Sequence, residues 1–240
     1  MTRPRWSVVI PAYNESRRLP RYLGEVVAYL EARGEPWEVF VVDDGSTDGT
    51  LAVVEAVARA HPPVRGLRRE TNSGKGAAVR RGMLTATGEY RLFADADGAT
   101  PIAELTRLEP ALTAGAEVVI GSRARRDPAV TVRARWHRVA AGRVFNCFVV
   151  GLGLRGVTDS QCGFKAFSAR AAEDLFGRLR TDGFGFDVEL LLLAQRAGYR
   201  IVEVPVNWVE QPASKVGVLK DGPRMLWEIM VARRRLRRSA

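Results

Sequence analysis

Residues 37–50 read WEVFVVDDGSTDGT, an apolar run that ends abruptly at two adjacent aspartates, Asp43 and Asp44. A short run of β-branched and aromatic residues predicts a buried strand over residues 37–42. The polar cluster that follows predicts the start of a helix over residues 50–61. Two neighbouring carboxylates at a strand end are costly unless they meet donors or a cation. This point of the chain is therefore a candidate ligand site.

The same alternation of strand and helix extends in both directions from this stretch. An apolar strand over residues 7–11 and a helix over residues 16–33 come before it. After it, the pattern predicts strands over residues 64–69, 90–94 and 117–120, and helices over residues 74–87 and 101–114. Strands that alternate with helices imply right-handed crossovers and a parallel sheet covered on both faces. The sequence therefore predicts an α/β fold, with polar motifs at the carboxyl ends of the strands, where ligands bind.

The second half of the chain is less regular. The pattern predicts helices over residues 131–151, 169–179 and 186–196, a loop over residues 159–167, an alternating strand over residues 201–208 and a basic amphipathic helix over residues 222–238. No internal repeat or low-complexity linker divides the chain. We therefore expect a single domain over residues 1–240.

The composition points to an anionic partner. Of the 240 residues, 46% are hydrophobic, and 37 Lys and Arg against 27 Asp and Glu give a net charge of +10. Such a balance suits a nucleic acid, a phosphorylated substrate or an anionic lipid. Nucleic-acid binding would need basic residues interleaved with aromatics in a motif such as an RRM or an OB-fold, and the sequence contains none. We therefore expect no nucleic-acid partner.

The cysteines, histidines and apolar runs limit the compartment. Cys147 and Cys162 lie in no CxxC motif, so we interpret them as reduced, buried thiols of a cytoplasmic protein. His61 and His137 are far apart in the sequence, which gives no indication of a His-rich metal site. The first residues run into a strand without the apolar core of a signal peptide. No apolar run reaches the ~18–20 residues of a membrane-spanning helix.

Another acidic motif, after that of Asp43 and Asp44, follows the strand predicted over residues 90–94. Asp95 and Asp97 stand two apart in the segment FADADGAT, and on an extended chain they would point the same way. Two carboxylates beside a glycine can hold a hard divalent cation such as Mg²⁺ or Mn²⁺. The alternative is an Asp-Gly turn that caps a helix, since a lone DxD pattern is a weak signal.

The ordered set of motifs carries more weight than any one of them. SVVIPAYNE (7–15), VVDDGSTDGT (41–50) and NSGKGAAVRRGMLTATGEYRLFADADGAT (72–100) together resemble the family 2 glycosyltransferases of GT-A fold. Within that family, the chain is most similar to dolichyl-phosphate β-glucosyltransferases and dolichol-phosphate mannose synthases. DADGAT (95–100) and DSQCGFK (159–165) favour the glucosyl branch. The resemblance covers nearly the whole chain and implies a GT-A, Rossmann-like, mostly parallel sheet with a C-terminal amphipathic helix.

The resemblance also assigns roles to residues. It implies a nucleotide-sugar-binding half over residues 1–122 and an acceptor-binding half with interfacial helices over residues 123–240. The residues implied to bind the nucleotide-sugar are Pro11, Tyr13, Glu15, Asp43, Asp44, Lys75 and Asp95. Asp95 and Asp97 would hold a Mg²⁺ or Mn²⁺ ion that bridges the diphosphate. The residues implied to act in catalysis are Asp97, Arg123, Asp187 and Lys215.

The acceptor decides which of these groups are needed. Transfer to a hydroxyl needs a general base, and Asp187 stands where relatives with hydroxyl acceptors place that carboxylate. A phosphate acceptor is already anionic near neutral pH, and it needs cations instead. Asp187 could then only position groups, or simply belong to a helix start rich in acids. The candidate cations of the second half are Arg123, Arg135, Arg138, Lys165, Lys215 and Lys220.

The expected function is inverting transfer of a hexose, glucose from UDP-glucose, onto a polyprenyl or dolichyl phosphate. The alternatives are a GDP-mannose-dependent polyprenyl-phosphate mannosyltransferase and a soluble transferase with a small hydroxyl or phosphate acceptor. Basic amphipathic segments over residues 131–154 and 222–238 predict peripheral association with the anionic inner face of the cell membrane. The alternative is that their apolar faces close the protein core.

Overall fold

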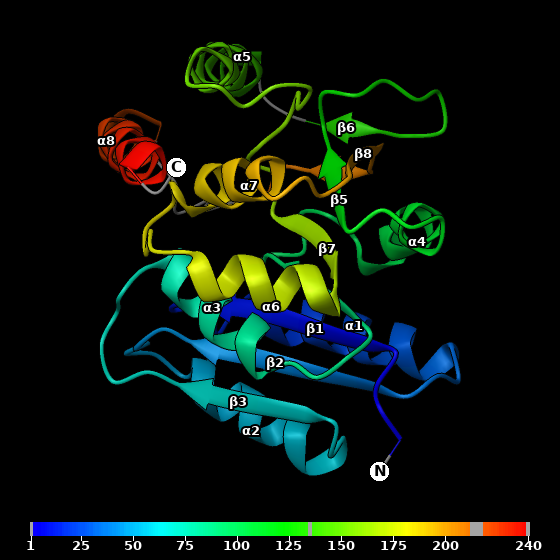
Figure 1. Cartoon of the computed structure of the whole chain (residues 1–240). Helices are drawn as coiled ribbons and strands as arrows, with labels where there is room; N and C mark the ends of the chain where they lie inside the picture. Colours follow the sequence, from blue (N-terminus) through cyan, green and yellow to red (C-terminus); the bar gives the residue numbers. More distant parts are fainter. Residues whose placement is uncertain (1, 134–135, 212–217, 239–240) are drawn as a thin grey trace.

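This computed structural model describes residues 2–133, 136–211 and 218–238. Within them, seven strands form one sheet in the order β3-β2-β1-β4-β7-β5-β8 (Figure 1). The strands are β1 Trp6–Ala12, β2 Trp37–Asp43, β3 Val64–Arg68, β4 Tyr90–Ala94, β5 Val118–Ser122, β7 Phe164–Ser168 and β8 Ile201–Pro205. All neighbouring pairs are parallel except those of β7, which runs antiparallel to β4 and β5. A mostly parallel sheet, as predicted, is confirmed.

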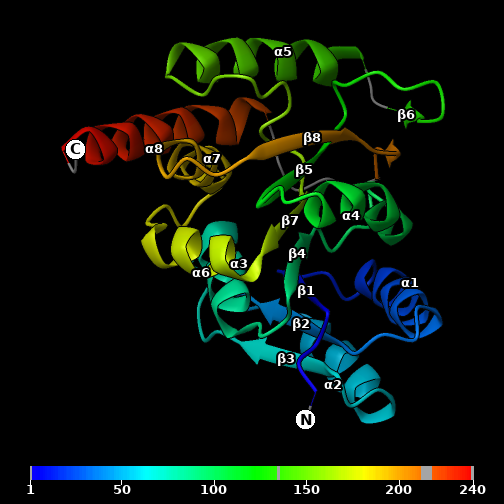
Figure 2. The same cartoon turned by 45° about the vertical axis from the view of Figure 1, so that its right-hand side comes forward.

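Helices cover both faces of the sheet (Figures 1 and 2). They are α1 Leu19–Ala32, α2 Thr50–Ala60, α3 Lys75–Thr85, α4 Leu105–Thr113, α5 Trp136–Gly151, α6 Ala169–Arg178, α7 Phe186–Arg196 and α8 Val218–Arg238, with a 3₁₀ turn at Ile102–Glu104 before α4. The apolar residues of α1, α2 and α4 form one core on one face, and those of α3, α6 and α7 form a second core on the other. Among the described side chains, Val149 of α5 and Ile229 of α8 belong to the second core. Cys162 is buried as expected, but the expectation that Cys147 of α5 is buried is wrong, because its side chain is exposed.

The strands form for the reason the sequence indicates. Every residue of β1 is buried, because a parallel strand between two helical layers is covered on both faces. Helix α1 starts with proline in its first turn, where no hydrogen-bond donor is lost. Its buried residues, among them Leu19, Leu23, Val26 and Leu30, recur at helical spacing and face the sheet.

Strand β7 is the main difference from the sequence prediction. The prediction of a loop over residues 159–167 is wrong from Phe164 onwards, because this segment runs through the middle of the sheet. Lys165 obscured the strand, since a lysine normally marks a solvated position. Its side chain is fully buried here, and its ammonium is bound by other groups of the chain.

Two further predicted elements are divided in the structure. The helix predicted over residues 131–151 begins at Trp136, after a two-residue strand β6 (Val132–Arg133). Strand β6 pairs with β9 (Trp208–Val209), which separates from β8 after Pro205. Pairing between segments about 75 residues apart leaves no local signal, so periodicity could not find it.

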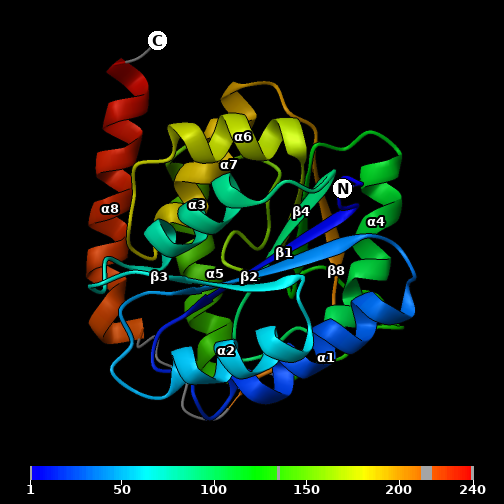
Figure 3. The ribbon, with the colours of Figure 1, turned by 90° about the horizontal axis from the view of Figure 1, so that it is seen from below.

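The parallel pairing assembles the site at one edge of the sheet. Ala12 of β1 lies opposite Asp43 of β2, and Val9 lies opposite Phe93 of β4. The loops that follow these three strands therefore leave the sheet at the same end (Figure 3). None of the helices in the described ranges is both long and apolar enough to cross a membrane.

Candidate active site

The loops after β1 and β2 are joined by hydrogen bonds. The Asn14 amide donates to Ser46 Oγ at 2.8 Å, and the Thr47 amide donates to Asn14 Oδ1 at 2.8 Å. Asn14 has φ = 51°, a left-handed conformation that asparagine tolerates better than most residues. The Ser46 amide also donates to Asp43 Oδ1 at 3.1 Å, so the side chain of Asp43 is held at this edge.

Glu15 is held by an arginine that the sequence analysis did not select. Arg18 donates from Nε and Nη2 to the two carboxylate oxygens of Glu15, at 2.7 and 2.5 Å. Its Nη1 lies 4.0 Å from Asp97 Oδ2, so one guanidinium links the first and third motifs. The hydrogen bond to Glu15 raises the pKa of Arg18. The spacing of three between Glu15 and Arg18 was the available signal.

Two other residues predicted to bind the nucleotide belong to β1 and the loop after it. Pro11 is a buried residue of the strand, and Tyr13 has an exposed side chain just beyond the strand end. Both stand at the edge where the three motifs meet, and their contact with a nucleotide stays a prediction.

Asp44 holds the start of α3. Its carboxylate accepts hydrogen bonds from the amides of Ser73 and Gly74, the latter at 2.8 Å, and pairs with Arg69 Nε at 3.0 Å. Gly74 has φ = 106°, a conformation that favours glycine. Asp44 therefore shapes the turn that presents Lys75, while its contact with a nucleotide stays a prediction.

Lys75 and Asp95 form an ion pair across the site. Lys75 Nζ lies 2.6 Å from Asp95 Oδ1 and 5.9 Å from the centre of the Phe186 ring. Burial lowers the pKa of Lys75, but the charges of Asp95 and Asp187 outweigh burial and raise it. The lysine is therefore a fixed positive charge at the edge of the sheet.

Asp95 and Asp97 lie in a tight turn. The expectation that they stand on extended chain is wrong, since the Gly98 amide donates to the Asp95 carbonyl at 3.2 Å. The Ala99 amide donates to Asp97 Oδ1 at 3.0 Å. Gly163 makes room for Asp95, because a Cβ at that glycine would lie 1.9 Å from Asp95 Oδ2. The side chains of Asp95 and Asp97 keep 36% and 24% of their exposure, so both remain open to a ligand.

The aspartate pair fits a divalent cation. Burial, and next the charge of Asp95, raise the pKa of Asp97. A cation bound between the two carboxylates would offset the repulsion between their negative charges. Among the described residues, no three His, Cys, Asp or Glu side chains converge on one point. The pair therefore resembles a site for Mg²⁺ or Mn²⁺, in which substrate phosphates and waters supply the other oxygen ligands.

Asp187 and Lys165 form a buried pair, and the charge of Asp187 also acts on Lys75. Lys165 Nζ donates to an Asp187 carboxylate oxygen and to the Cys162 carbonyl, the latter at 2.7 Å, and lies 5.2 Å from the centre of the Phe93 ring. Burial raises the pKa of Asp187, against the opposing charge of Lys165. The prediction that Lys165 is available to an acceptor phosphate is wrong, because its side chain is fully buried.

Arg123 follows β5 and is fixed by Asp159. Its amide, Nε and Nη2 donate to the Asp159 carboxylate at 2.9, 2.7 and 2.7 Å. Its guanidinium carbon lies 5.4 Å from the centre of the Trp208 ring. Burial raises the pKa of Asp159, but the positive charge and hydrogen bonds of Arg123 outweigh burial and lower it. The sequence gives no local signal for this pairing, because Asp159 lies 36 residues from Arg123.

Four further cations were predicted to hold the acceptor phosphate, namely Lys215, Arg135, Arg138 and Lys220. Lys215 and Arg135 lie outside the described residues, as do the side chains of Arg138 and Lys220. The described site residues do lie within range of each other's charge, since Asp95 shifts the pKa values of Lys75, Asp97, Asp187 and Arg123.

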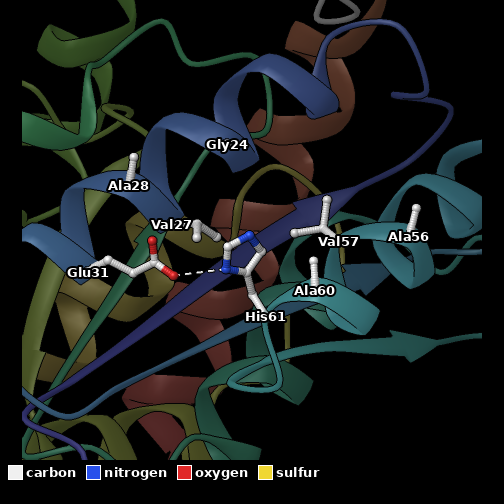
Figure 4. A pocket seen from close by; sticks show the side chains of 8 residues that line it. All are labelled: Gly24, Val27, Ala28, Glu31, Ala56, Val57, Ala60 and His61. Carbon is white, nitrogen blue, oxygen red and sulfur yellow. Dashed lines mark hydrogen bonds and ion pairs between the residues drawn. The ribbon is translucent and has the colours of Figure 1, made fainter.

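A hollow of about 400 Å³ lies between α1 and α2, away from this site (Figure 4). Small and apolar side chains line it, together with His61, whose Nδ1 lies 2.8 Å from Glu31 Oε1. None of the described residues that line it is a lysine or an arginine. The hollow therefore does not suit a nucleotide diphosphate.

Solved structures share the fold of this chain. Glucosyl-3-phosphoglycerate synthase from Mycobacterium tuberculosis, in complex with Mn²⁺, UDP-glucose and phosphoglyceric acid, superposes with a TM-score of 0.69. The match covers 96% of this chain and 80% of that one at 22% identity, so it supports the fold alone. The UDP complex of the same enzyme also gives a TM-score of 0.69. The GT-A architecture expected from the motifs is thereby confirmed.

Curated relatives share far more of the sequence. A dolichyl-phosphate beta-glucosyltransferase of Trichomonas vaginalis is 42% identical over 220 residues, which cover 88% of this chain and 65% of that protein. The enzymes of that name from Saccharomyces cerevisiae and Homo sapiens are 35% and 38% identical, over 73% and 69% of their lengths. The chain thus spans about two thirds of the length of these relatives. Glycosyl transferase family 2 matches residues 7–176, and the chain belongs to this family.

Proposed function

We propose that this chain transfers glucose from UDP-glucose to a dolichyl or other polyprenyl phosphate, with inversion at the anomeric carbon. The observation that carries the proposal is the grouping of Asp95, Asp97 and Lys75 at the edge where β1, β2 and β4 end. Carboxylates for a cation beside a fixed ammonium suit a nucleotide diphosphate. The names of the relatives indicate the sugar and the acceptor.

In this proposal the first half of the chain holds the donor. Asp95 and Asp97 would hold Mg²⁺ or Mn²⁺, which when bound supplies positive charge against the departing diphosphate. Lys75 is set to add a second positive charge, and Pro11, Tyr13, Glu15 and Asp43 are proposed to contact the nucleoside. The half-buried guanidinium of Arg18 keeps Glu15 in place on the side of Asp97.

Residues 123–240 are proposed to bind the acceptor. Arg123 would face the acceptor phosphate, with the guanidinium plane fixed by Asp159 and Trp208. A phosphate attacks without deprotonation, so no general base is required. The burial of Asp187 against Lys165 supports a positioning role for this carboxylate. Lys215 is proposed as a second cation for the acceptor.

The outer helices are proposed to lie on a membrane surface. Trp227 and Met230 of α8 have exposed side chains, at 62% and 43% of their full area, as does Val150 of α5, at 45%. Arginines at 224, 233, 234, 235 and 237 lie along α8. Apolar side chains flanked by arginine suit the interface of an anionic leaflet, which supports peripheral association with the cytoplasmic side of the cell membrane.

The test is a set of incubations read by mass spectrometry. The chain is mixed with Mn²⁺ or Mg²⁺, a short polyprenyl phosphate, and UDP-glucose or GDP-mannose in parallel. We expect a hexosyl polyprenyl phosphate from UDP-glucose, with a β-linkage in the NMR spectrum. Product from GDP-mannose alone would instead indicate a polyprenyl-phosphate mannosyltransferase. Transfer only to small soluble acceptors would indicate a soluble transferase. A retained α-linkage would contradict single-step inversion.

A further inference from the structure

A short segment between α6 and α7, residues 181–185, lies between α8 and the start of α3 (Figures 1 and 3). We call it the 181–185 strap. On the side of α3, the Ala77 amide donates to the Asp182 carbonyl at 3.1 Å. A Cβ at Gly74 would lie 2.4 Å from that carbonyl oxygen, and one at Gly76 would lie 2.4 Å from the Thr181 carbonyl oxygen. The strap is thus in close contact with both glycines that flank Lys75.

On the side of α8, the strap closes around Glu228. The Gly185 amide donates to Glu228 Oε2 at 2.9 Å. A Cβ at Gly183 would lie 2.1 Å from Glu228 Oε1, and one at Gly185 would lie 2.9 Å from Glu228 Cβ. Glu228 is buried, although it belongs to a helix with an exposed basic face. Its carboxylate therefore occupies a space that exists because both strap residues lack side chains.

A second carboxylate fixes the other end of the strap. The Thr181 amide donates to Glu189 Oε2 of α7 at 2.7 Å, and Glu189 is buried as well. Arg80 of α3 pairs with Asp182 Oδ1 at 2.9 Å. The strap is therefore tied to α7, α8 and α3 at once, through Glu189, Glu228 and Arg80.

We infer that Glu228 is a positioning residue for the donor site. It holds the 181–185 strap, and through the strap it holds the N-terminal turn of α3, so that Lys75 stays opposite Asp95. This inference rests on the proposed function, in which Lys75 and the aspartates receive the nucleotide diphosphate. It also connects the C-terminal helix α8 to the donor site, so that the state of α8 bears on nucleotide affinity.

The test measures binding of UDP with Mn²⁺ to the full chain by isothermal titration calorimetry, without lipid. Glu228→Ala should weaken UDP binding about tenfold, as loss of an outer-shell support commonly does. Glu228→Gln keeps an acceptor for the Gly185 amide and should stay within about threefold of the wild type. Gly183→Ala inserts a methyl group where the Glu228 carboxylate lies, so it should reproduce the loss without altering α8.

The losses of UDP affinity caused by Gly183→Ala and Glu228→Ala should not be additive. Gly183→Ala and Glu228→Ala break the same contact. The UDP affinity of the double variant should therefore equal that of whichever single variant binds UDP less tightly. Glu25→Ala is the control, because Glu25 forms an exposed i,i+4 pair with Arg21 on α1 and lies away from the strap. It should bind UDP as the wild type does. Melting temperatures without nucleotide report whether each variant is folded.

The outcomes separate the two proposals. If the wild type does not bind UDP with Mn²⁺, the proposed function fails. If the wild type binds while Glu228→Ala and Gly183→Ala bind within twofold of it, the positioning role of Glu228 is wrong. Fully additive losses would overturn it too. Should Glu228→Ala fail to fold, Gly183→Ala and Glu228→Gln decide the question.

Discussion

Lys75 Nζ lies 2.6 Å from Asp95 Oδ1, so a cation from the start of α3 already occupies one oxygen of the aspartate pair. A divalent cation held by Asp95 and Asp97, as proposed, would therefore compete with the lysine ammonium for the same carboxylate. When a nucleotide diphosphate is present, both can be satisfied, because phosphate oxygens supply further ligands. The site is thus expected to bind the metal and the nucleotide cooperatively.

Lys75→Ala should separate these two effects. Without the ammonium, Asp95 is open to the metal, so Mn²⁺ should bind more tightly when no nucleotide is present. The diphosphate loses a positive charge, so KM for UDP-glucose should rise about tenfold. Titration of Mn²⁺ by electron paramagnetic resonance, beside steady-state kinetics, checks both. Weaker Mn²⁺ binding in the variant would contradict the competition, and Lys75→Arg controls for the loss of charge.

Asp97→Asn should remove activity without harming the fold. Burial and the negative charge of Asp95 oppose the ionisation of Asp97, and both raise the pKa of its carboxyl. A neutral amide relieves that cost and can still accept the Ala99 amide, so the melting temperature should rise by about 2 °C. Turnover should fall about 100-fold or more, because the cation loses a ligand. Thermal unfolding and product formation measure the two effects, and retained turnover would refute the metal assignment.

Lys165→Met should destabilise the protein strongly. It leaves Asp187 buried without its ammonium partner, and breaking a buried pair in this way costs about 3–5 kcal/mol. Changing both residues, in Lys165→Met with Asp187→Leu, leaves no orphaned charge and should recover most of that loss. Urea denaturation gives the free energies of unfolding. A single variant within about 1 kcal/mol of the wild type would show that the pair is not a structural unit.

The Arg123–Asp159 pair should make the free energy of unfolding depend on pH in the acidic range. Asp159 has a lowered pKa in the folded protein, so its ionised form contributes stability above the unfolded pKa of about 3.9. This contribution is lost as the pH falls below that value and through the folded pKa. Asp159→Asn should therefore be less stable than the wild type at pH 7, and the difference should narrow towards pH 3. Urea denaturation at both pH values checks it, and a difference that widens in acid would contradict the sign.

Much of this protein could be predicted from local patterns. Apolar runs located β1, β2 and β4, of which the last two end at aspartates, and the alternation with helices predicted a parallel sheet. Those features could be predicted because they depend on period and on neighbours along the chain. The family could be predicted from the same motifs, because the residues that this chain shares with the family lie at the ends of these strands.

Contacts between distant segments carried no such signal. Strand β7 lies between β4 and β5 with Lys165 as its second residue, and the burial of that lysine is tolerated because Asp187, later in the chain, and the Cys162 carbonyl accept hydrogen bonds from it. Arg123 pairs with Asp159, which lies 36 residues later in the chain. Glu228 of the last helix accepts a hydrogen bond from the 181–185 strap. Local sequence could name the charged groups of this site. Their pairing depended on three-dimensional packing, because a buried charge is stable only beside the partner that the fold brings to it.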